Sequence, residues 1–500
     1  MSGEQTRVAT GIDGLDAVLC GGFPRDRIYL VQGDPGVGKT TLAIQFLRAG
    51  ARAGEKCLYV TLSETRDELQ AVARSHEWTL DGIDIYEMSA GEPSSRLSDE
   101  ENTLYVPAEV ELGERMKALL EQVDRVKPSR IVIDSCSELR LLAQSPLRFR
   151  RQLLALKEDL VRRRCTILLL ENPSREEGDP LLQSLVHGVI SMEQLSPEYG
   201  AERRRLRVVK LREVQFRGGY HDFIIQRAEG VTVFPRLVAA EHHTPFKREP
   251  VSSGVVELDA LLGGGLDRGT ATLIIGPAGS GKSALASCYA AAAAGRGEHV
   301  AMFTFDEGAG TLFGRAAALG MSLEPHVEAG RLTVQQIDPA ELAPGQFATA
   351  VLHAIERDNA RMVVIDSLNG YLQAMPEEKF LTAQLHELLS LLRQRGVVAV
   401  MVVAQHGLLG NMRAPVDVSY LADSVVLTRY FEAGGRVRKA ISVMKKRSGK
   451  HEDTIRELKM GPRGITVGPP LEAFRGVLSG VPTFVGTTAP EGPLLDHERG

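Results

Sequence analysis

Short apolar runs recur along the chain, each separated from the next by a segment of helical length. In the first half they are residues 28–33 (IYLVQG), 57–62 (CLYVTL), 130–135 (RIVIDS) and 165–170 (CTILLL). In the second half they are residues 272–277 (TLIIGP), 299–305 (HVAMFTF), 362–367 (MVVIDS) and 397–404 (VVAVMVVA). Fully apolar strands that alternate with helices are typical of a mostly parallel sheet covered on both faces. The pattern therefore predicts an α/β fold.

Each half then ends in a denser set of strand signals. In the first half these are residues 204–212 (RRLRVVKLR), 221–227 (HDFIIQR) and 231–235 (VTVFP). Strands that follow one another with only short turns between them pair antiparallel. We therefore expect an antiparallel extension of each parallel sheet.

The two halves repeat the same pattern at nearly constant spacing. Lys39 and Lys282 are 243 positions apart, as are Glu64 and Glu307, and two strand-terminal aspartates are 232 apart. Such offsets indicate duplication of a whole domain. We predict an N-terminal domain at 1–238, a linker at 239–252, a C-terminal domain at 253–484 and a disordered tail at 485–500.

Composition and charge narrow the class of protein. The 500 residues are 43% hydrophobic and 25% charged, as in globular proteins, and the net charge of −5 gives no overall attraction to nucleic acid or an anionic membrane. No apolar run approaches the ~20 residues of a membrane span, and the N-terminus has no secretory signal. Five scattered cysteines without a CxxC pair predict a reduced, cytoplasmic protein without a zinc site.

A glycine-rich phosphate loop follows the first repeated strand in both halves. Residues 33–40 (GDPGVGKT) and 276–283 (GPAGSGKS) both match GxxxxGK[ST] between a strand and a helix. The glycines let backbone N–H groups surround phosphate oxygens, the helix N-terminus adds positive potential, and the lysine reaches the β- and γ-phosphates. Two copies in register predict ATP bound in each half. The predicted nucleotide-binding residues are Gly36, Val37, Gly38, Lys39, Thr40 and Thr41, and Gly279, Ser280, Gly281, Lys282, Ser283 and Ala284.

Each half also carries candidates for a magnesium site. Asp134 and Asp366 each end an apolar strand, and Thr40 and Ser283 supply a hydroxyl at the end of each phosphate loop. A carboxylate at the carboxyl edge of the sheet would orient a metal-bound water. The alternative is an aspartate that caps the next helix. We predict Mg²⁺ held by Thr40 and Asp134 and by Ser283 and Asp366.

Acidic residues at the end of the second strand are the candidates for activating water. They are Glu64 in the first half and Asp306 and Glu307 in the second, 24 or 25 residues after each loop lysine. Hydrolysis of ATP needs a base near the γ-phosphate. The alternative is that these residues complement the dipole of the following helix.

The combination resembles the KaiC family of two-domain RecA-type ATPases, which includes a circadian clock protein. The residues that carry the resemblance are the two phosphate loops, YVTLSET and MFTFDEG, the two IDS strands, and the late pairs Lys210 with Arg212 and Lys445 with Arg447. The resemblance implies a homohexamer of two stacked rings, with ATP between subunits and each K-x-R pair reaching the neighbour's γ-phosphate. Alternation along a strand puts both basic residues on one face, as a trans-acting pair requires. A solvated basic strand face is the alternative.

Two departures from the family pattern qualify the expected activity. Fully active members carry two adjacent glutamates after the second strand, but the first is Ser63 in one half and Asp306 in the other. The family's C-terminal domain phosphorylates an adjacent Ser-Thr pair, and here Ser419 is followed by Tyr420. The resemblance therefore implies at most a partial phosphorylation cycle, which would use Ser419. The alternative is that Ser419 is an ordinary loop serine.

We interpret the chain as an ATP-hydrolysing ring protein with autokinase activity in signalling or clock-like regulation, with itself and signalling proteins as partners. One alternative is a nucleotide-sensing hexameric scaffold with little turnover. The second is a RecA-like DNA-handling ATPase that uses arginine clusters such as 203–205. The acidic net charge and the 5% aromatic content disfavour binding to nucleic acid.

Overall fold

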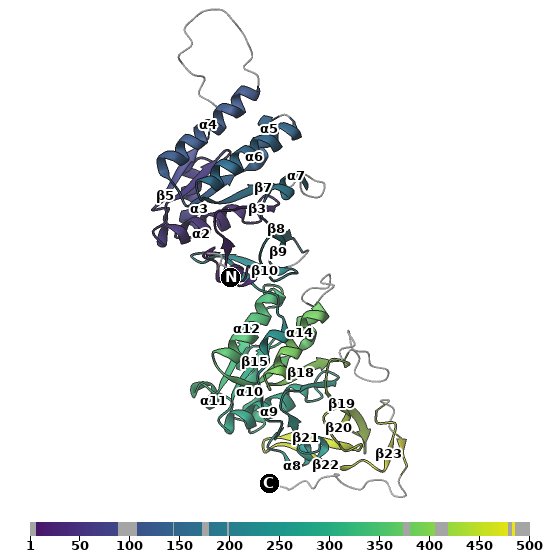
Figure 1. Ribbon diagram of the computed structural model, residues 1–500. Helices are drawn as coiled ribbons and strands as arrows, with labels where there is room; N and C mark the ends of the chain where they lie inside the picture. Colours follow the sequence, from purple (N-terminus) through teal and green to yellow (C-terminus); the bar gives the residue numbers. More distant parts are fainter. Residues whose placement is uncertain are drawn as a thin grey trace, which may run out of the picture. The chain divides into compact units, whose positions relative to one another are not determined.

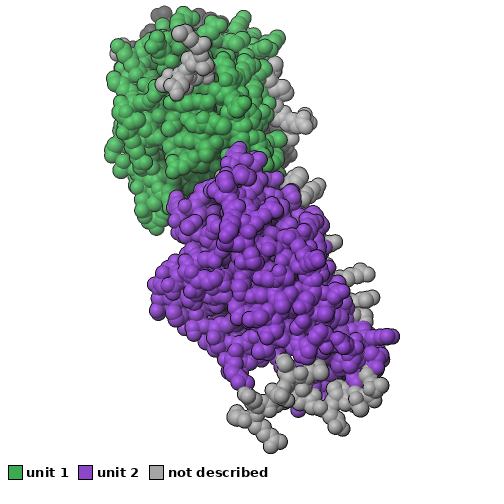
Figure 2. Space-filling model, turned by 60° about the horizontal axis from the view of Figure 1, so that its bottom comes forward, with its two compact units in different colours: residues 1–236 green, residues 237–500 purple. Residues whose placement is uncertain are grey.

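The computed structural model describes residues 7–88, 108–143, 145–172, 180–197, 200–373, 381–405, 419–478 and 483–485. The chain divides into two compact units, Met1–Arg236 and Leu237–Gly500, which Figure 2 shows in different colours. The predicted tail at 485–500 lies outside the described residues except for Val485. Among the described residues, no helix combines the length and the apolarity that crossing a bilayer would need.

The first unit is built on one twisted sheet with helices on both faces (Figure 1). Its strands are β3 (Ile28–Gly33), β4 (Cys57–Thr61), β5 (Ile83–Glu87), β6 (Arg130–Asp134), β7 (Thr166–Glu171), β8 (Gly188–Leu195), β9 (Arg203–Leu211), β10 (His221–Gln226) and β11 (Gly230–Phe234). Its helices are α1 (Asp13–Val18), α2 (Lys39–Arg52), α3 (Arg66–Ser75), α4 (Ala108–Val126), α5 (Cys136–Ala143), α6 (Pro146–Arg162) and α7 (Pro180–Leu185). A separate short pair joins β1 (Arg7–Val8) to β2 (Phe23–Pro24).

The second unit repeats this arrangement. Its main strands are β14 (Ala271–Gly276), β15 (His299–Thr304), β16 (Leu332–Gln336), β17 (Ala360–Asp366), β18 (Val398–Ala404), β19 (Ser424–Ala433), β20 (Arg436–Lys446), β21 (Ile455–Gly461) and β22 (Gly464–Pro470). Its helices are α8 (Val256–Leu261), α9 (Lys282–Gly295), α10 (Ala309–Ala318), α11 (Glu324–Glu328), α12 (Pro344–Glu356), α13 (Leu368–Gln373) and α14 (Leu381–Gln394). Short pairs are β12 (Pro250–Val251) with β13 (Leu266–Asp267), and β23 (Phe474–Arg475) with β24 (Thr483–Phe484).

Both sheets have the same strand order. Among the described residues, the order is β5-β4-β6-β7-β3-β8-β9-β10-β11 in the first unit and β16-β15-β17-β18-β14-β19-β20-β21-β22 in the second. The first six strands of each run parallel, and the last three pair antiparallel. The predicted α/β class, the tandem duplication of the fold and the antiparallel extension are therefore confirmed.

Alternation along the central strands explains why both faces of the sheet are covered. In β3, Ile28 and Leu30 pack into the cluster that α4, α5 and α6 cover, whereas Tyr29 and Val31 pack into the cluster under α1, α2 and α3. Successive side chains of a strand point to opposite faces. Neither face can be left to water, because both rows are apolar.

The segment predicted as a linker makes contacts with the second unit. It contains a short 3₁₀ helix, Ala239–His242. The backbone N–H of Ala239 donates to Glu387 Oε2 at 3.2 Å, and that of Thr244 donates to the carbonyl of Gln394 at 3.2 Å. These two bonds attach residues 239–244 to α14.

Candidate functional site

The two phosphate loops connect β3 to α2 and β14 to α9. Gly38 and Gly281 are the N-caps of these helices, with φ of 108° and 102°. This left-handed conformation favours glycine. A Cβ would also meet Ile225 Cδ1 at 2.4 Å from Gly38, or Met460 Cε at 1.9 Å from Gly281. The sequence thus keeps glycine where a side chain has no room, at the helix N-terminus that a phosphate would meet.

Both loop lysines fold back into their own loops. Lys39 Nζ donates to the carbonyls of Gly33 at 2.6 Å and Asp34 at 3.0 Å. Lys282 Nζ donates to the carbonyl of Pro277 at 2.7 Å. Burial lowers the pKa of both ammonium groups. A polyphosphate would supply the negative charge that these buried cations lack.

In the first unit, Thr40 and Asp134 form the predicted metal pair. Thr40 is the second residue of α2, and its Oγ1 donates to Asp134 Oδ2 at 3.3 Å. Tyr59 Oη donates to the same oxygen at 2.6 Å. Asp134 is only 8% exposed, and burial raises its pKa, although the two hydroxyl bonds and Lys39 oppose that rise. A carboxylate and a hydroxyl are hard oxygen donors of the kind that Mg²⁺ prefers.

In the second unit, Ser283 and Asp366 occupy the same positions. The hydroxyl of Ser283 hydrogen-bonds to Asp366, but Asp366 Oδ2 is buried and has no hydrogen-bond partner. Burial is the main cause that raises the pKa of Asp366 to about 6, and the nearby Glu307 adds to it. An orphaned buried carboxylate oxygen beside a hydroxyl fits a site for a divalent cation.

Glu64 lies at the carboxyl edge of the first sheet, beyond β4. Its backbone is fixed by Thr61, whose Oγ1 donates to the carbonyl of Glu64 at 2.6 Å and accepts from its N–H at 3.0 Å. Its Oε2 is buried without a hydrogen-bond partner. Burial first, and then the charge of Asp134, raises the pKa of Glu64. The neighbouring Ser63 is exposed.

The corresponding acids of the second unit are both engaged. Ser367 Oγ donates to Asp306 Oδ2. Arg315, on α10, donates from Nη1 to Glu307 Oε2 at 2.6 Å. An arginine bonded to a carboxylate holds it in one orientation. The two units therefore differ in how freely their candidate bases can move.

The basic pairs lie at the opposite edge of each sheet from the phosphate loops. Lys210 is paired with Val189, which is paired with Leu30, and the N–H of Arg212 bonds to His187 beside the start of β3. The phosphate loop follows Gly33, the last residue of β3. Lys210 is level with Leu30, three residues or ~10 Å before Gly33, and Arg212 is level with Ile28, five residues or ~16 Å before it; β9 also lies two strands away, another ~10 Å. Neither side chain reaches the phosphate loop of its own unit.

The second unit has the same geometry. Lys445 is paired with Val425, which is paired with Leu273 near the start of β14. Lys445 Nζ donates to the carbonyls of Ser419 at 3.1 Å and Ala422 at 2.7 Å, and Arg447 Nη2 donates to that of Tyr420 at 3.2 Å. Ser419 therefore lies beside the basic pair and away from the phosphate loop of its own unit.

Three features of the site were not predicted from the sequence. These are the bond from Tyr59 to Asp134, the ion pair of Arg315 with Glu307, and the bond from Ser367 to Asp306. The first had a signal in the sequence. Tyr59 is the aromatic residue of β4, two residues before Thr61, which is paired with Asp134 across the sheet. The second pair is eight residues apart, and Glu307 lies before the start of α10, so no helical spacing indicates it.

Comparison with known proteins identifies the family. A model of the KaiC ATPase family matches residues 8–238 and 251–472. The chain belongs to the KaiC family. It is 25% identical over 488 residues to the circadian clock protein KaiC3 of Synechocystis sp., covering 96% of this chain and 95% of that protein. It is 26% identical to the circadian clock oscillator protein KaiC of Thermostichus vulcanus, covering 97% and 93%, and 26% identical to that of Synechococcus elongatus, covering 96% and 92%.

Membership of the KaiC family gives the coarse activity of both units. The chain is an ATP-binding protein with two tandem RecA-like ATPase domains of the KaiC type. The matched residues include both phosphate loops and both strand-terminal aspartates.

Proposed function

We propose that the chain assembles into a homohexameric ring that hydrolyses ATP bound between neighbouring subunits. One subunit would contribute the phosphate loop, and the next would contribute Lys210 with Arg212 or Lys445 with Arg447. The observation that carries this proposal is the position of both basic pairs, at the sheet edge opposite the phosphate loop of their own unit. Basic residues that act on a phosphate from that edge must act on another subunit's nucleotide. Head-to-tail contacts of this kind form a ring when the rotation between subunits closes.

The residues at each carboxyl edge have separate roles in the proposed reaction. Lys39 and Lys282 neutralise phosphate charge, and Glu64 and Glu307 accept the proton of the attacking water. Mg²⁺ would be held by Thr40 and Asp134 and by Ser283 and Asp366, and would neutralise charge on the phosphates. The raised pKa of Glu64 brings this carboxyl closer to neutral pH, which suits a general base.

We also propose that the C-terminal ring phosphorylates Ser419. The Ser419 hydroxyl would attack the γ-phosphorus, forming the O–P bond as the bond to the ADP oxygen breaks, while Glu307 or Asp306 accepts the hydroxyl proton. The contact of Lys445 with the Ser419 carbonyl supports this, because the acceptor then lies on the face that would reach the neighbour's nucleotide. The biological role we propose is signalling or clock-like regulation through partner proteins.

Native mass spectrometry with and without ATP, combined with phosphosite mapping, tests assembly and kinase activity together. We expect a hexamer with ATP, smaller species without it, and phosphate on Ser419. The variants R212A and R447A should bind ATP and yet hydrolyse it slowly, because each removes a trans contact and leaves the phosphate loop intact. A monomer saturated with ATP would contradict the ring, and an unmodified Ser419 would contradict the kinase.

A ring that binds ATP for assembly with little turnover is the second candidate function. The ion pair between Arg315 and Glu307, and Ser63 in place of an acid, favour it. Phosphate release should be measured for the wild type beside E64Q and E307Q. Equal, near-zero rates in all three would support the scaffold and exclude the ATPase.

A further inference from the structure

The carboxylate of Asp134 receives a hydrogen bond that its repeat counterpart lacks. Tyr59 is 2% exposed, and its hydroxyl donates to Asp134 Oδ2 at 2.6 Å. The same oxygen accepts the longer bond from Thr40 at 3.3 Å. Both bonds go to the same carboxylate oxygen, and the 3.3 Å bond is longer than an ordinary O–H···O hydrogen bond. The tyrosine is therefore the stronger of the two restraints on this oxygen.

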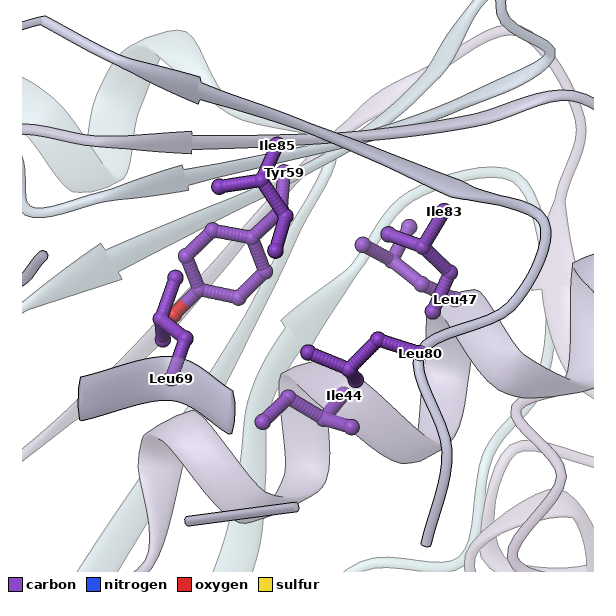
Figure 3. A pocket seen from close by; sticks show the side chains of 7 residues that line it. All are labelled: Ile44, Leu47, Tyr59, Leu69, Leu80, Ile83 and Ile85. Atoms are coloured by element: carbon purple, nitrogen blue, oxygen red, sulfur yellow. The ribbon is translucent and has the colours of Figure 1, made fainter. Parts of the chain in front are cut away.

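The fold fixes the tyrosine as well as the bond. Tyr59 on β4 is paired with Val132 on β6, and Asp134 is two residues further along β6 and so on the same face of the sheet. The ring lines a small apolar pocket with Leu69 of α3 and Ile85 of β5 (Figure 3). These apolar side chains hold the ring in place. Among the described contacts, the hydroxyl hydrogen-bonds only to Asp134 and Thr40.

The second unit provides a natural comparison in the same chain. The residue at the position of Tyr59 is Met302, which packs in the core beside Val364 and carries no donor. Asp366 Oδ2 is buried with no hydrogen-bond partner. Asp366 keeps the bond from the Ser283 hydroxyl, so its carboxylate is restrained by one side-chain hydrogen bond where that of Asp134 is restrained by two.

We propose that Tyr59 is a positioning residue for the metal site of the N-terminal unit, where its hydroxyl holds Asp134 oriented for Mg²⁺ with ATP, whereas Asp366 of the C-terminal unit is held by the Ser283 hydroxyl without a second donor. This inference rests on the proposed metal roles of Asp134 and Asp366. Groups that orient a metal ligand change metal affinity typically by about 10- to 100-fold. The N-terminal site should therefore fill at a lower concentration of free Mg²⁺.

The test measures metal binding directly in the full chain. In a K282A background, which leaves one nucleotide site, Mn²⁺ is titrated by electron paramagnetic resonance in the presence of a non-hydrolysable ATP analogue. Y59F removes only the hydroxyl, and we expect the half-saturating concentration of Mn²⁺ to rise about tenfold. The matched control is Y29F, because Tyr29 is also buried and its hydroxyl donates at 2.6 Å to the carbonyl of Pro24, away from the site. Y29F should bind Mn²⁺ as the parent does.

A second variant at the same position tests the role of Tyr59 if Y59F folds poorly. Y59M reproduces the residue of the other unit and should match Y59F. The K39A chain, which retains only the C-terminal site, should need more Mn²⁺ than the K282A chain. If Y59F or Y59M binds Mn²⁺ as tightly as Y29F, the role of Tyr59 is overturned. If the parent itself binds no Mn²⁺ in the presence of the nucleotide analogue, the proposed metal site fails instead, so the two failures are distinguishable.

Discussion

The two units share strand order, phosphate loop and terminal aspartate. They differ in which acidic side chain a further residue restrains: the terminal aspartate in the first unit and the candidate base in the second. In the first, Tyr59 holds Asp134, and Glu64 Oε2 has no hydrogen-bond partner. In the second, Asp366 Oδ2 has none, and Arg315 holds Glu307. Duplication kept the phosphate-binding geometry and the hydroxyl bond to the terminal aspartate, and divergence left a tyrosine bond to the metal ligand in one unit and an arginine bond to the candidate base in the other. We expect the two sites to differ in metal requirement and in turnover more than in their affinity for phosphate.

The largest expected effect comes from removing one loop lysine at a time. K39A and K282A should each abolish nucleotide binding in one unit, weakening it more than about 100-fold, because the buried ammonium is the main positive charge in each loop. Nucleotide extracted from purified protein and quantified by chromatography should fall from two per chain to one in each variant. A single variant that loses both nucleotides would show that the two sites are coupled and would contradict independent binding at the two phosphate loops.

The two units should also differ in their stability at acidic pH. His221 is 1% exposed, its Nδ1 accepts from the N–H of Arg236 at 2.8 Å, and Nε2 donates to the carbonyl of Arg217 at 2.9 Å. This arrangement requires the neutral ring, and burial lowers the pKa of His221 to about 4. Burial also lowers the pKa of His187 to about 4. The unfolded state binds the proton more tightly, so stability is present above the unfolded pKa of ~6.5 and is lost as the pH falls towards 4.

For His221 alone the loss between pH 7 and pH 5 is about 2 kcal/mol. Calorimetry of the full chain should show the transition of the first unit moving to lower temperature over this interval. The second unit has Arg456 at the matching position on its sheet. H221Q should reduce the acid sensitivity, and a first transition that stays fixed between pH 7 and pH 5 would exclude the linkage.

Removing the arginine that restrains Glu307 should change the rate of ATP hydrolysis. Arg315 corresponds to Val72 of the first unit, 243 positions earlier. In a K39A background, R315V should raise ATP hydrolysis about fivefold, because an ion pair of this exposure contributes up to ~1 kcal/mol to holding Glu307. Steady-state phosphate release measures this, with E307Q as the inactive control. A lower rate in R315V would mean that Arg315 orients Glu307 productively.

The smallest expected effect is on the free energy of unfolding, at the start of the helix that follows Glu64 or Glu307. Thr65 caps α3 in a reciprocal capping box with Glu68, but α10 begins at Gly308 without a side-chain cap. T65A should lower the free energy of unfolding by about 1 kcal/mol, and G308S should raise it by a few tenths, since Gly308 has an ordinary φ of −76°. Denaturant titrations of the full chain would measure both. No loss in T65A would show that the cap is not coupled to global unfolding.

The sequence predicted what depends on backbone pattern. Alternating apolar runs and constant offsets were enough for two α/β units, for the phosphate loops and for the terminal aspartates, because each follows from strand and loop position. The bonds of Tyr59 and Arg315 depend on how far a side chain reaches in three dimensions, which spacing does not determine. The location of Lys210 at the far edge of the sheet required the strand register, since the same K-x-R pattern fits either end of a strand.

The distance between each basic pair and its own phosphate loop has a consequence for mixtures of variant chains. If each active site in the proposed ring is shared, a chain carrying K282A and a chain carrying R447A are defective in different halves of the same site. When the two are co-expressed, some interfaces will combine the intact halves, and part of the C-terminal activity will return. Two inactive alleles would then complement each other, whereas two copies of either allele alone would not.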